Sequence, residues 1–509
     1  MNIGQVLSHH AKYKSTHLAF VCGGDELNYL QLNESVNQIA NALLRNGVRK
    51  GDKVTLLLQN CRELWELYWA ISKIGAVIVP LSPLLRGKGL VNQINNADTA
   101  LLITTYDNEH YITPIIEQLK IKKSDFWVIG GTHHYTDFYT EKQASSVDEP
   151  DMPSMDPEDL FNIIYSSGTT GQPKGIMHSH RIRSYYMALF GSYFRMTPES
   201  VVLHSGSIIF NGSFLTTMPV MFHGGTFILH KSFDAQNVLK DIKKYEVTHT
   251  ILVPSQIIAA LQYDTFTSQH IPSLECILSV GAPLNAKHKN ALNDRIPNVF
   301  YELYGLTEGF ITILDKNDFH KKTGSVGKPP PFFDMRIVDE LGNDLNDNEI
   351  GEIVGRGPIL MQGYYKDTVR TEQTIKNGWL FTGDLGYRDA DGFLYLVDRK
   401  KDMIISGSVN VYPNDIEKVI IKNDAVLEVA VFGVEDAQWG ETPVAAIVLK
   451  KGYSVITDDI KSWINENVEA RFHKVSDIMI LEELPRNVAG KVLKMELRDL
   501  YNSKYKTKN

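Results

Sequence analysis

The sequence of 509 residues has few cysteines and no excess of positive charge. Its three cysteines, Cys22, Cys61 and Cys276, lie far apart and form no Cys-x-x-Cys pair. This pattern argues against a disulfide framework or a cysteine-based zinc site and fits a reducing compartment. The formal net charge of −8 provides no basic field that would attract nucleic acid. We therefore expect no nucleic-acid partner.

The sequence also lacks the apolar segments that direct a chain into a membrane. Residues 1–20 contain no apolar core of a secretory signal peptide. The most apolar long segment, residues 69–81, is too short to span a bilayer and contains Lys73. The C-terminal letters YKTKN are not a peroxisomal address. We expect a cytoplasmic protein without a transmembrane segment; the sequence leaves peripheral membrane contact and homodimer formation open.

Strand-like and helix-like patterns alternate along most of the chain, whose length calls for at least two domains. Residues 32–48 place apolar side chains at helical spacing, and Gly47 is the expected end of that helix. A strand pattern, a second helix and the apolar strand 76–81 follow, and a similar alternation recurs from residue 224 onward. Such alternation predicts an α/β fold with mostly parallel βαβ-type sheets.

The pattern changes near residue 326. Between residues 326 and 397, short strands alternate with Gly, Asp and Asn turns, which predicts a small antiparallel or barrel-like unit. The charged stretch DRKKD, residues 398–402, then separates this unit from a segment with its own strand and helix pattern. We predict a large N-terminal domain over residues 1–398 and a small α+β C-terminal domain over residues 403–509.

A loop rich in glycine and hydroxyl groups, IIYSSGTTGQPKG, occupies residues 163–175. It fails the Walker A pattern, because Pro173 stands at the second glycine position and Gly175 follows Lys174. Backbone N–H groups of such a loop, its hydroxyls and a lysine ammonium are nevertheless suitable donors to an anion. From these residues alone, both a phosphate-binding loop and a surface β-turn remain open.

Three later motifs occur in a fixed order: YELYGLTE (301–308), WLFTGDLG (379–386) and LPRNVAGKVLK (484–494). Together with the glycine-rich loop and DRKKD, they resemble the acyl-adenylate-forming enzymes over nearly the whole chain. That superfamily includes acyl-CoA synthetases, adenylation domains of peptide synthetases and beetle luciferases. The resemblance implies that a carboxylate attacks the α-phosphate of ATP and that the acyl group then passes to a thiol. ATP, Mg²⁺ and coenzyme A are the implied cosubstrates and cofactor.

The resemblance also implies a role for each matched residue. The nucleotide-binding residues would be Ser166, Ser167, Gly168, Thr169, Thr170, Gly171 and Lys174 at the phosphates, Gly281, Ala282, Pro283 and Tyr304 at adenine, and Asp384 and Arg399 at the ribose. Thr307 would bond the α-phosphate, and Glu308 would hold Mg²⁺, which is commonly bound by one or two carboxylates and phosphate oxygens.

Two further roles fall on the C-terminal part of the chain. Lys491 is the predicted catalytic lysine, whose ammonium would stabilise charge on the attacking carboxylate and the phosphorus centre. Residues 399–402 would form a hinge around Lys401, about which a mobile C-terminal domain rotates and brings Gly407 to the thiol. Many members carry a second glycine where this chain has Ser408, which leaves details of the thiol tunnel open.

The acid is less well defined by the sequence. Phe210 matches an aromatic gate, Asn211 follows it, and Gly305 would leave room at the pocket floor. No acidic residue stands nearby to hold an ammonium group, so an amino acid is disfavoured. We predict a fatty acid–CoA ligase that forms AMP. The alternative is an aryl-acid adenylating ligase that loads coenzyme A or a carrier-protein thiol, since Asn211 could bond a ring hydroxyl.

Two hypotheses belong to other functional classes. A nucleotide-binding regulator without catalysis is disfavoured because Lys174, Glu308, Asp384 and Lys491 are all present. A metal-binding protein could use His178 and His180, which suit one strand face, but the sequence shows no clear third ligand.

Overall fold

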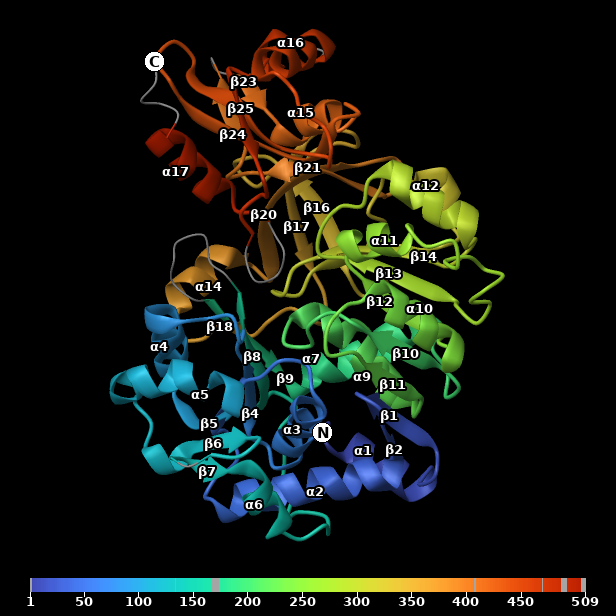
Figure 1. The fold of residues 1–509 in the computed structure, drawn as a ribbon, viewed down its shortest axis with the longest axis vertical. Coiled ribbons are helices and arrows are strands. Elements are labelled where there is room, and N and C mark those ends of the chain that lie inside the picture. Colours follow the sequence, from blue (N-terminus) through green and yellow to red (C-terminus); the bar gives the residue numbers. More distant parts are fainter. Residues whose placement is uncertain are drawn as a thin grey trace. The chain divides into compact units, whose positions relative to one another are not determined.

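The computed structural model describes residues 2–132, 134–166, 174–406, 409–468, 470–486 and 492–504. The chain folds into two compact units. Unit 1 contains residues 1–334 and 356–380, and unit 2 contains residues 335–355 and 381–509 (Figure 1). No helix in the described ranges is both long and apolar enough to cross a bilayer.

Sheet A of unit 1 has eight strands in the order β15–β14–β13–β12–β10–β11–β1–β2. Its strands are β1 Leu18–Cys22, β2 Asp25–Asn28, β10 Val201–His204, β11 Thr226–Leu229, β12 His249–Leu252, β13 Cys276–Val280, β14 Phe300–Gly305 and β15 Ile311–Leu314. All neighbours from β14 to β1 pair in parallel, whereas β2 and β15 pair antiparallel at the two edges. Every residue of β11 and β12 is buried, as expected for parallel strands covered on both faces.

Sheet B of unit 1 also has eight strands, in the order β18–β9–β8–β4–β3–β5–β6–β7. They are β3 Lys53–Leu57, β4 Val77–Pro80, β5 Thr99–Thr105, β6 Phe126–Ile129, β7 Thr136–Asp137, β8 Leu160–Ser166, β9 Lys174–Ser179 and β18 Gly363–Tyr364. The β8–β9 and β9–β18 pairs are antiparallel and the remaining pairs are parallel.

Helices connect most of these strands. Those of unit 1 are α1 Gln5–Tyr13, α2 Tyr29–Arg45, α3 Arg62–Lys73, α4 Gly87–Asn96, α5 Tyr106–Ile112, α6 Phe138–Gln143, α7 His180–Tyr185, α8 Gly191–Tyr193, α9 Phe214–His223, α10 Ala235–Lys244, α11 Pro254–Ala260, α12 Ala286–Arg295, α13 Phe319–Lys322 and α14 Thr368–Thr374. A π-helical turn over Tyr186–Phe190 joins α7 to α8. Helix α2 begins with a capping box between Asn28 and Gln31, which satisfies two backbone donors at its start.

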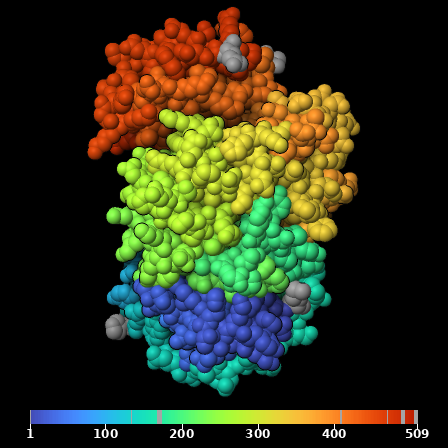
Figure 2. Space-filling model, turned by 90° about the vertical axis from the view of Figure 1, so that its right-hand side faces the viewer, coloured from blue at the N-terminus to red at the C-terminus, as the bar shows by residue number. Residues whose placement is uncertain are grey.

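The first residues of the chain pack beside much later ones. Strand β1 pairs with β11, so residues 18–22 lie next to residues 226–229. On the face drawn in Figure 2, blue N-terminal residues border green residues of unit 1. The fold of unit 1 therefore depends on strand pairing between segments about 200 residues apart in the sequence.

Sheet C consists of β16 Asp334–Val338, β17 Gly351–Arg356, β19 Ile375–Lys376, β20 Trp379–Arg388 and β21 Leu394–Arg399. Most of its residues belong to unit 2. The sheet confirms the short strands predicted between residues 326 and 397. Most of these strands belong to the same compact unit as the C-terminal residues. The hinge at residues 399–402 stays a prediction.

Sheet D of unit 2 comprises β22 Ile404–Ser406, β23 Val409–Val411, β24 Val426–Asp436, β25 Gly440–Leu449 and β26 Asp477–Leu481, with the helices α15 Pro413–Ile420, α16 Thr457–Asn467 and α17 Lys494–Lys504 (Figure 1). Side chains along β24 alternate between its two faces. Val431 packs in one core with residues of α15 and α16, whereas Ala430 and Phe432 pack in a second core with α17. The predicted α/β class, with parallel sheets followed by a smaller C-terminal domain, is confirmed.

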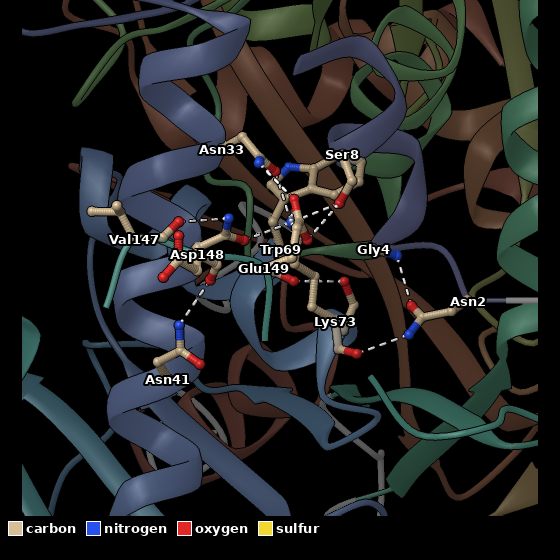
Figure 3. A network of polar contacts seen from close by, with 12 residues as sticks. Asn2, Gly4, Ser8, Asn33, Asn41, Trp69, Lys73, Val147, Asp148 and Glu149 are labelled. Atoms are coloured by element: carbon tan, nitrogen blue, oxygen red, sulfur yellow. Dashed lines mark hydrogen bonds and ion pairs between the residues drawn. The ribbon is translucent and has the colours of Figure 1, made fainter. Parts of the chain in front are cut away.

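A buried ammonium group ties the N-terminal helices to the segment that follows α6. Lys73 is fully buried, and its Nζ donates to the Oδ1 atoms of Asn33 and Asn37, both at 2.7 Å (Figure 3). It also forms an ion pair with Glu149 at 2.8 Å. Burial alone would raise the pKa of Glu149, but its bonds to Lys73, Asn33 and Ser8 outweigh burial and hold that pKa below its usual value. Lys73 thus joins three segments through one charge.

We expect the substitution Lys73→Met to lower the free energy of unfolding by about 2–3 kcal/mol, because two buried amide oxygens and Glu149 lose their donor. Because the pKa of Glu149 is depressed in the folded protein, its contribution is present above the unfolded value, about 4.3, and is lost as the pH falls through the folded value. Urea denaturation at neutral and acidic pH measures both effects. Lys366→Met, which removes a half-exposed ion pair with Asp98, is the control and should change stability by less than about 1 kcal/mol. Equal losses in the two variants would contradict the role of Lys73.

Candidate active site

Three predicted binding segments emerge from the same edge of sheet A. Residues 205–213 follow β10, residues 281–283 follow β13, and residues 306–310 follow β14. Because β10, β12, β13 and β14 are parallel neighbours, their carboxyl ends lie at one edge of the sheet. Gly281, Ala282 and Pro283 are exposed there. The fold therefore brings the predicted adenine and acid segments of unit 1 to one side.

The turn between β14 and β15 carries the predicted phosphate and magnesium residues. Thr307 and Glu308 are both partly buried, and the backbone carbonyl of Glu308 accepts a bond from Met361 N at 2.9 Å. Gly309 has φ 110°, and a Cβ there would lie 2.1 Å from the carbonyl oxygen of Ile359. Only glycine fits this conformation and this approach. The turn is thus fixed against the segment that follows β17.

Gly305 also stands where a side chain does not fit. A Cβ there would lie 2.6 Å from Cγ2 of Ile311 and 2.7 Å from the carbonyl oxygen of Phe310. The close pairing of Gly305 with Ile311 accounts for this glycine without a substrate. Its predicted role at the pocket floor stays a prediction.

Lys174 and Glu308 are joined through an aromatic side chain that the motif analysis missed. Lys174 is the first residue of β9 and the strand partner of Ser166, and its Nζ lies 5.5 Å from the ring centre of Tyr364. The hydroxyl of Tyr364 donates to Oε1 of Glu308 at 2.8 Å. Burial, followed by the negative charge of Glu308, raises the pKa of Tyr364, which therefore stays protonated as a donor. The pairing of β18 with β9 brings Tyr364 to this position.

We expect Tyr364→Phe to raise the Mg²⁺ concentration needed for half-maximal activity by about tenfold, because the carboxylate of Glu308 loses the bond that orients it. A magnesium titration of ATP consumption measures this change. Tyr365→Phe removes a hydroxyl bound to the partly exposed Asp98 and is the matched control. An unchanged magnesium requirement in Tyr364→Phe would contradict the orienting role.

Hydrogen bonds from Arg183 to His178 and from His178 to Thr307 support the backbone of Thr307. Nε2 of His178 lies 2.8 Å from the carbonyl oxygen of Thr307, and Nδ1 of His178 lies 3.2 Å from Nη2 of Arg183. Since Arg183 only donates, Nδ1 accepts and Nε2–H donates to Thr307. Burial, followed by the nearby charge of Arg183, holds the pKa of His178 well below its usual value, so the ring stays neutral. Both nitrogens of His178 are engaged, so His178 has no free nitrogen for a metal, and no group of three or more His, Cys, Asp or Glu side chains among the described residues could hold one.

The predicted acid residues lie at the end of the loop after β10. Phe210 is partly buried, and Nδ2 of Asn211 donates to the hydroxyl of Tyr186 at 3.0 Å. Oδ1 of Asn211 is buried and has no hydrogen-bond partner in the described part of the chain. Hydroxyls of Ser279 and Thr216 are likewise buried without a partner among the residues described. Buried polar atoms are normally satisfied, and among these three the free Oδ1 of Asn211 is the one that belongs to a predicted acid-binding residue.

The two predicted ribose residues lie opposite each other in unit 2. Asp384 and Arg399 are strand partners in the β20–β21 pair, and Nε of Arg399 lies 3.3 Å from Oδ1 of Asp384. Asp384 is largely buried, whereas the side chain of Arg399 is about 41% exposed. Lys401 follows in an exposed turn, and its hinge role remains a prediction.

Several predicted residues lie outside the described ranges. They are Ser167, Gly168, Thr169, Thr170 and Gly171 of the glycine-rich loop, Gly407 and Lys491. Their roles rest on the sequence. Sequence reasoning in turn missed His178 and Arg183 as supports of Thr307, although both lie within ten residues of the glycine-rich loop.

Two family models cover most of the chain. A model described as "AMP-binding enzyme" matches residues 7–365, and one described as "AMP-binding enzyme C-terminal domain" matches residues 415–491. The chain belongs to the AMP-binding enzyme family, that is, to the acyl-adenylate-forming superfamily. AMP-forming CoA ligases of this superfamily use ATP, Mg²⁺ and coenzyme A.

Similar proteins extend over nearly the full length of the chain. A 2-succinylbenzoate–CoA ligase from Bacillus cereus is 32% identical over 481 residues, which are 94% of each chain. A feruloyl-CoA synthase from an Amycolatopsis species is 31% identical over 484 residues, again 94% of each. The structure of ATP-bound MatB from Rhodopseudomonas palustris matches with a TM-score of 0.89 and 27% identity, and the match covers 99% of this chain and 100% of that one.

Proposed function

We propose that this protein is an AMP-forming acid–CoA ligase that acts on an aryl acid. The observation that carries the proposal is that Lys174, Tyr364 and Glu308 lie together, which supports the predicted binding of ATP phosphates and Mg²⁺ by Lys174 and Glu308. Hard oxygen donors of this kind suit Mg²⁺. When bound, Mg²⁺ would neutralise phosphate charge and help to hold ATP in place.

The proposed reaction has two displacements. In the first, an oxygen of the acid's carboxylate forms a bond to the α-phosphorus, and the bond from that phosphorus to the β-phosphate oxygen breaks, which releases pyrophosphate. In the second, the thiol sulfur of coenzyme A, having lost its proton, bonds to the acyl carbon, and the bond from that carbon to the AMP oxygen breaks. Lys174, and Lys491 from the C-terminal part, would stabilise the charge on the phosphates and at the phosphorus centre. Asp384 and Arg399 would position the ribose.

The choice of an aryl acid rests on two kinds of support. The 2-succinylbenzoate–CoA ligase and the feruloyl-CoA synthase are relatives named for aryl acids. In this chain, Nδ2 of Asn211 donates to the hydroxyl of Tyr186, and Oδ1 of the same amide has no partner among the described residues, so a polar substituent on a ring would meet a free acceptor. A plain alkyl chain would leave these buried polar atoms unsatisfied, which costs binding free energy.

A panel of acids tests the proposal. Release of AMP and pyrophosphate is measured for hydroxylated and carboxylated benzoic and cinnamic acids, for saturated fatty acids and for amino acids, each with and without coenzyme A. The proposal predicts turnover with aryl acids that depends on coenzyme A. Turnover mainly with fatty acids would support the fatty acid expected from the sequence instead. No AMP formation with any acid would contradict the ligase itself.

A further inference from the structure

A buried charged side chain on α7 has no counter-ion among the described residues. Arg183, on α7, is completely buried. Its Nε donates to Oδ1 of Asn162 at 2.9 Å, and its Nη2 donates to His178. Its Nη1 has no hydrogen-bond partner, and no carboxylate pairs with it, within the described ranges.

Aromatic rings surround this guanidinium group. Its central carbon lies 4.6 Å from the ring centre of Tyr186 and 4.2 Å from that of Phe214. Ring faces attract a cation but do not neutralise it. Burial lowers the pKa of Arg183 to about 10, which still leaves it charged at neutral pH. A buried charge without a counter-ion is strongly unfavourable, so a bound anion would stabilise it.

A second unpartnered donor lies beside the first. Nδ2 of Asn162 is buried and finds no acceptor in the part of the chain that the structure describes. Asn162 and Arg183 are hydrogen-bonded to each other, so their two remaining donors belong to one cluster. Each is an N–H donor that can bind a carboxylate oxygen, and the one on the guanidinium also carries positive charge.

This cluster is linked to the predicted acid pocket. The ring of Tyr186 contacts Arg183, and the hydroxyl of Tyr186 accepts a bond from Asn211, which is predicted to bind the acid. We propose that the acid carries a second carboxylate, at the end that is not activated, and that Arg183 and Asn162 bind it. The inference rests on the proposed function and narrows its substrate to dicarboxylic acids.

Arg183 also contacts His178, which supports Thr307, so a positioning role for Arg183 must be distinguished from substrate binding. If Arg183 binds a second carboxylate, its substitution should change the preference between acids that differ only at the end that is not activated. A positioning role predicts that both substrates are affected equally. The comparison of matched acids separates the two.

The test compares benzenedicarboxylic and short aliphatic dicarboxylic acids with their monomethyl esters, which keep one free carboxylate. For the wild-type enzyme, the best diacid should exceed its half-ester by at least about 10²-fold in kcat/KM, because the ester leaves a buried donor pair and charge unpaired. Arg183→Met should lose this preference to within about tenfold, chiefly through KM of the diacid. Arg183→Lys should retain part of it, because the charge remains but the fork of donors is lost.

Arg181→Met is the matched control, since Arg181 lies two residues earlier on α7, is partly exposed and pairs with Glu158 at the surface. It should leave the preference unchanged. Thermal melting of each variant shows whether it is folded. The preference of the wild-type enzyme for a diacid over its half-ester is measured without any variant, so it tests the inference even if a variant does not fold. If half-esters and diacids react equally with the wild-type enzyme, or if Arg183→Met lowers both equally, the second-carboxylate inference is wrong while the ligase function stands. If no acid yields AMP, the ligase function is wrong and this inference falls with it.

Discussion

The substitution Lys491→Ala is expected to lower the rate of acid- and ATP-dependent pyrophosphate release by about 10²–10³-fold. In the first displacement, negative charge builds on the attacking carboxylate and on the oxygens of the phosphorus centre. An ammonium group directed at that charge is an electrostatic stabiliser, and the loss of one such donor costs roughly 3–4 kcal/mol by analogy with oxyanion donors. The second displacement needs no such group. The variant should therefore convert a supplied acyl-adenylate and coenzyme A into acyl-CoA and AMP at a near-normal rate.

Two half-reactions measured separately check this expectation. Pyrophosphate release reports the first, and thioester formation from synthetic acyl-adenylate reports the second. Lys422→Ala, which removes an exposed lysine of the same unit, should leave both rates unchanged. Near-normal adenylation in Lys491→Ala would show that another residue supplies the catalytic charge. Equal loss in both half-reactions would point to a general structural defect.

The substitution Glu308→Gln is expected to lower kcat for adenylation by about 10²-fold or more and to raise the magnesium requirement. The amide keeps the shape of the side chain and can still accept from the hydroxyl of Tyr364, but it removes the negative charge that Mg²⁺ requires. The loss should be larger than in Tyr364→Phe, which removes only the orienting bond. We therefore expect the loss of the predicted magnesium ligand, Glu308, to lower adenylation more than the loss of the Tyr364 hydroxyl that orients it.

A magnesium titration of adenylation in both variants measures this ranking. Glu199→Gln, at an exposed position of unit 1, is the control and should match the wild type. High magnesium should restore Tyr364→Phe more completely than Glu308→Gln. If Glu308→Gln adenylates normally at ordinary magnesium concentrations, Glu308 is not the magnesium ligand.

Local sequence patterns predicted the parallel architecture well. Strands such as β4 and β12 are short apolar runs bounded by turns, and both lie wholly buried among parallel neighbours. Helix α2 follows its apolar periodicity and ends just before Gly47, whose φ of 89° suits glycine. These features depend on residues that are close in sequence, which is why a single sequence suffices to find them.

Contacts between distant segments could not be predicted in the same way. Tyr364 reaches Glu308 across 56 positions because β18 pairs with β9, and the short β18 has no distinctive pattern. Lys73 looked like an interruption in an apolar segment, yet it is buried against Glu149, 76 positions later. The bond from His178 to Thr307 likewise depends on how sheets A and B meet. Propensity and spacing carry no information about such partners.

The acid remained ambiguous for a related physical reason. Phe210 and Asn211 were visible in the sequence, but one apolar and one amide side chain fit either a fatty acid or an aryl acid. The structure adds that Asn211 is linked through Tyr186 to the buried charge of Arg183. The chemistry of a pocket follows from the side chains that converge on it, and the side chains proposed to bind the acid come from α7, β8 and the loop after β10.

A single-turnover experiment with the wild-type enzyme, ATP, Mg²⁺ and the best acid of the panel tests the two-step ligase mechanism itself. Without coenzyme A, we expect about one pyrophosphate released per enzyme and an acyl-adenylate that stays bound. Addition of coenzyme A should then convert that adenylate into acyl-CoA and AMP in equal amounts. If ATP is instead cleaved to ADP and phosphate, or if acyl-CoA forms without an adenylate, the two-step ligase mechanism is contradicted.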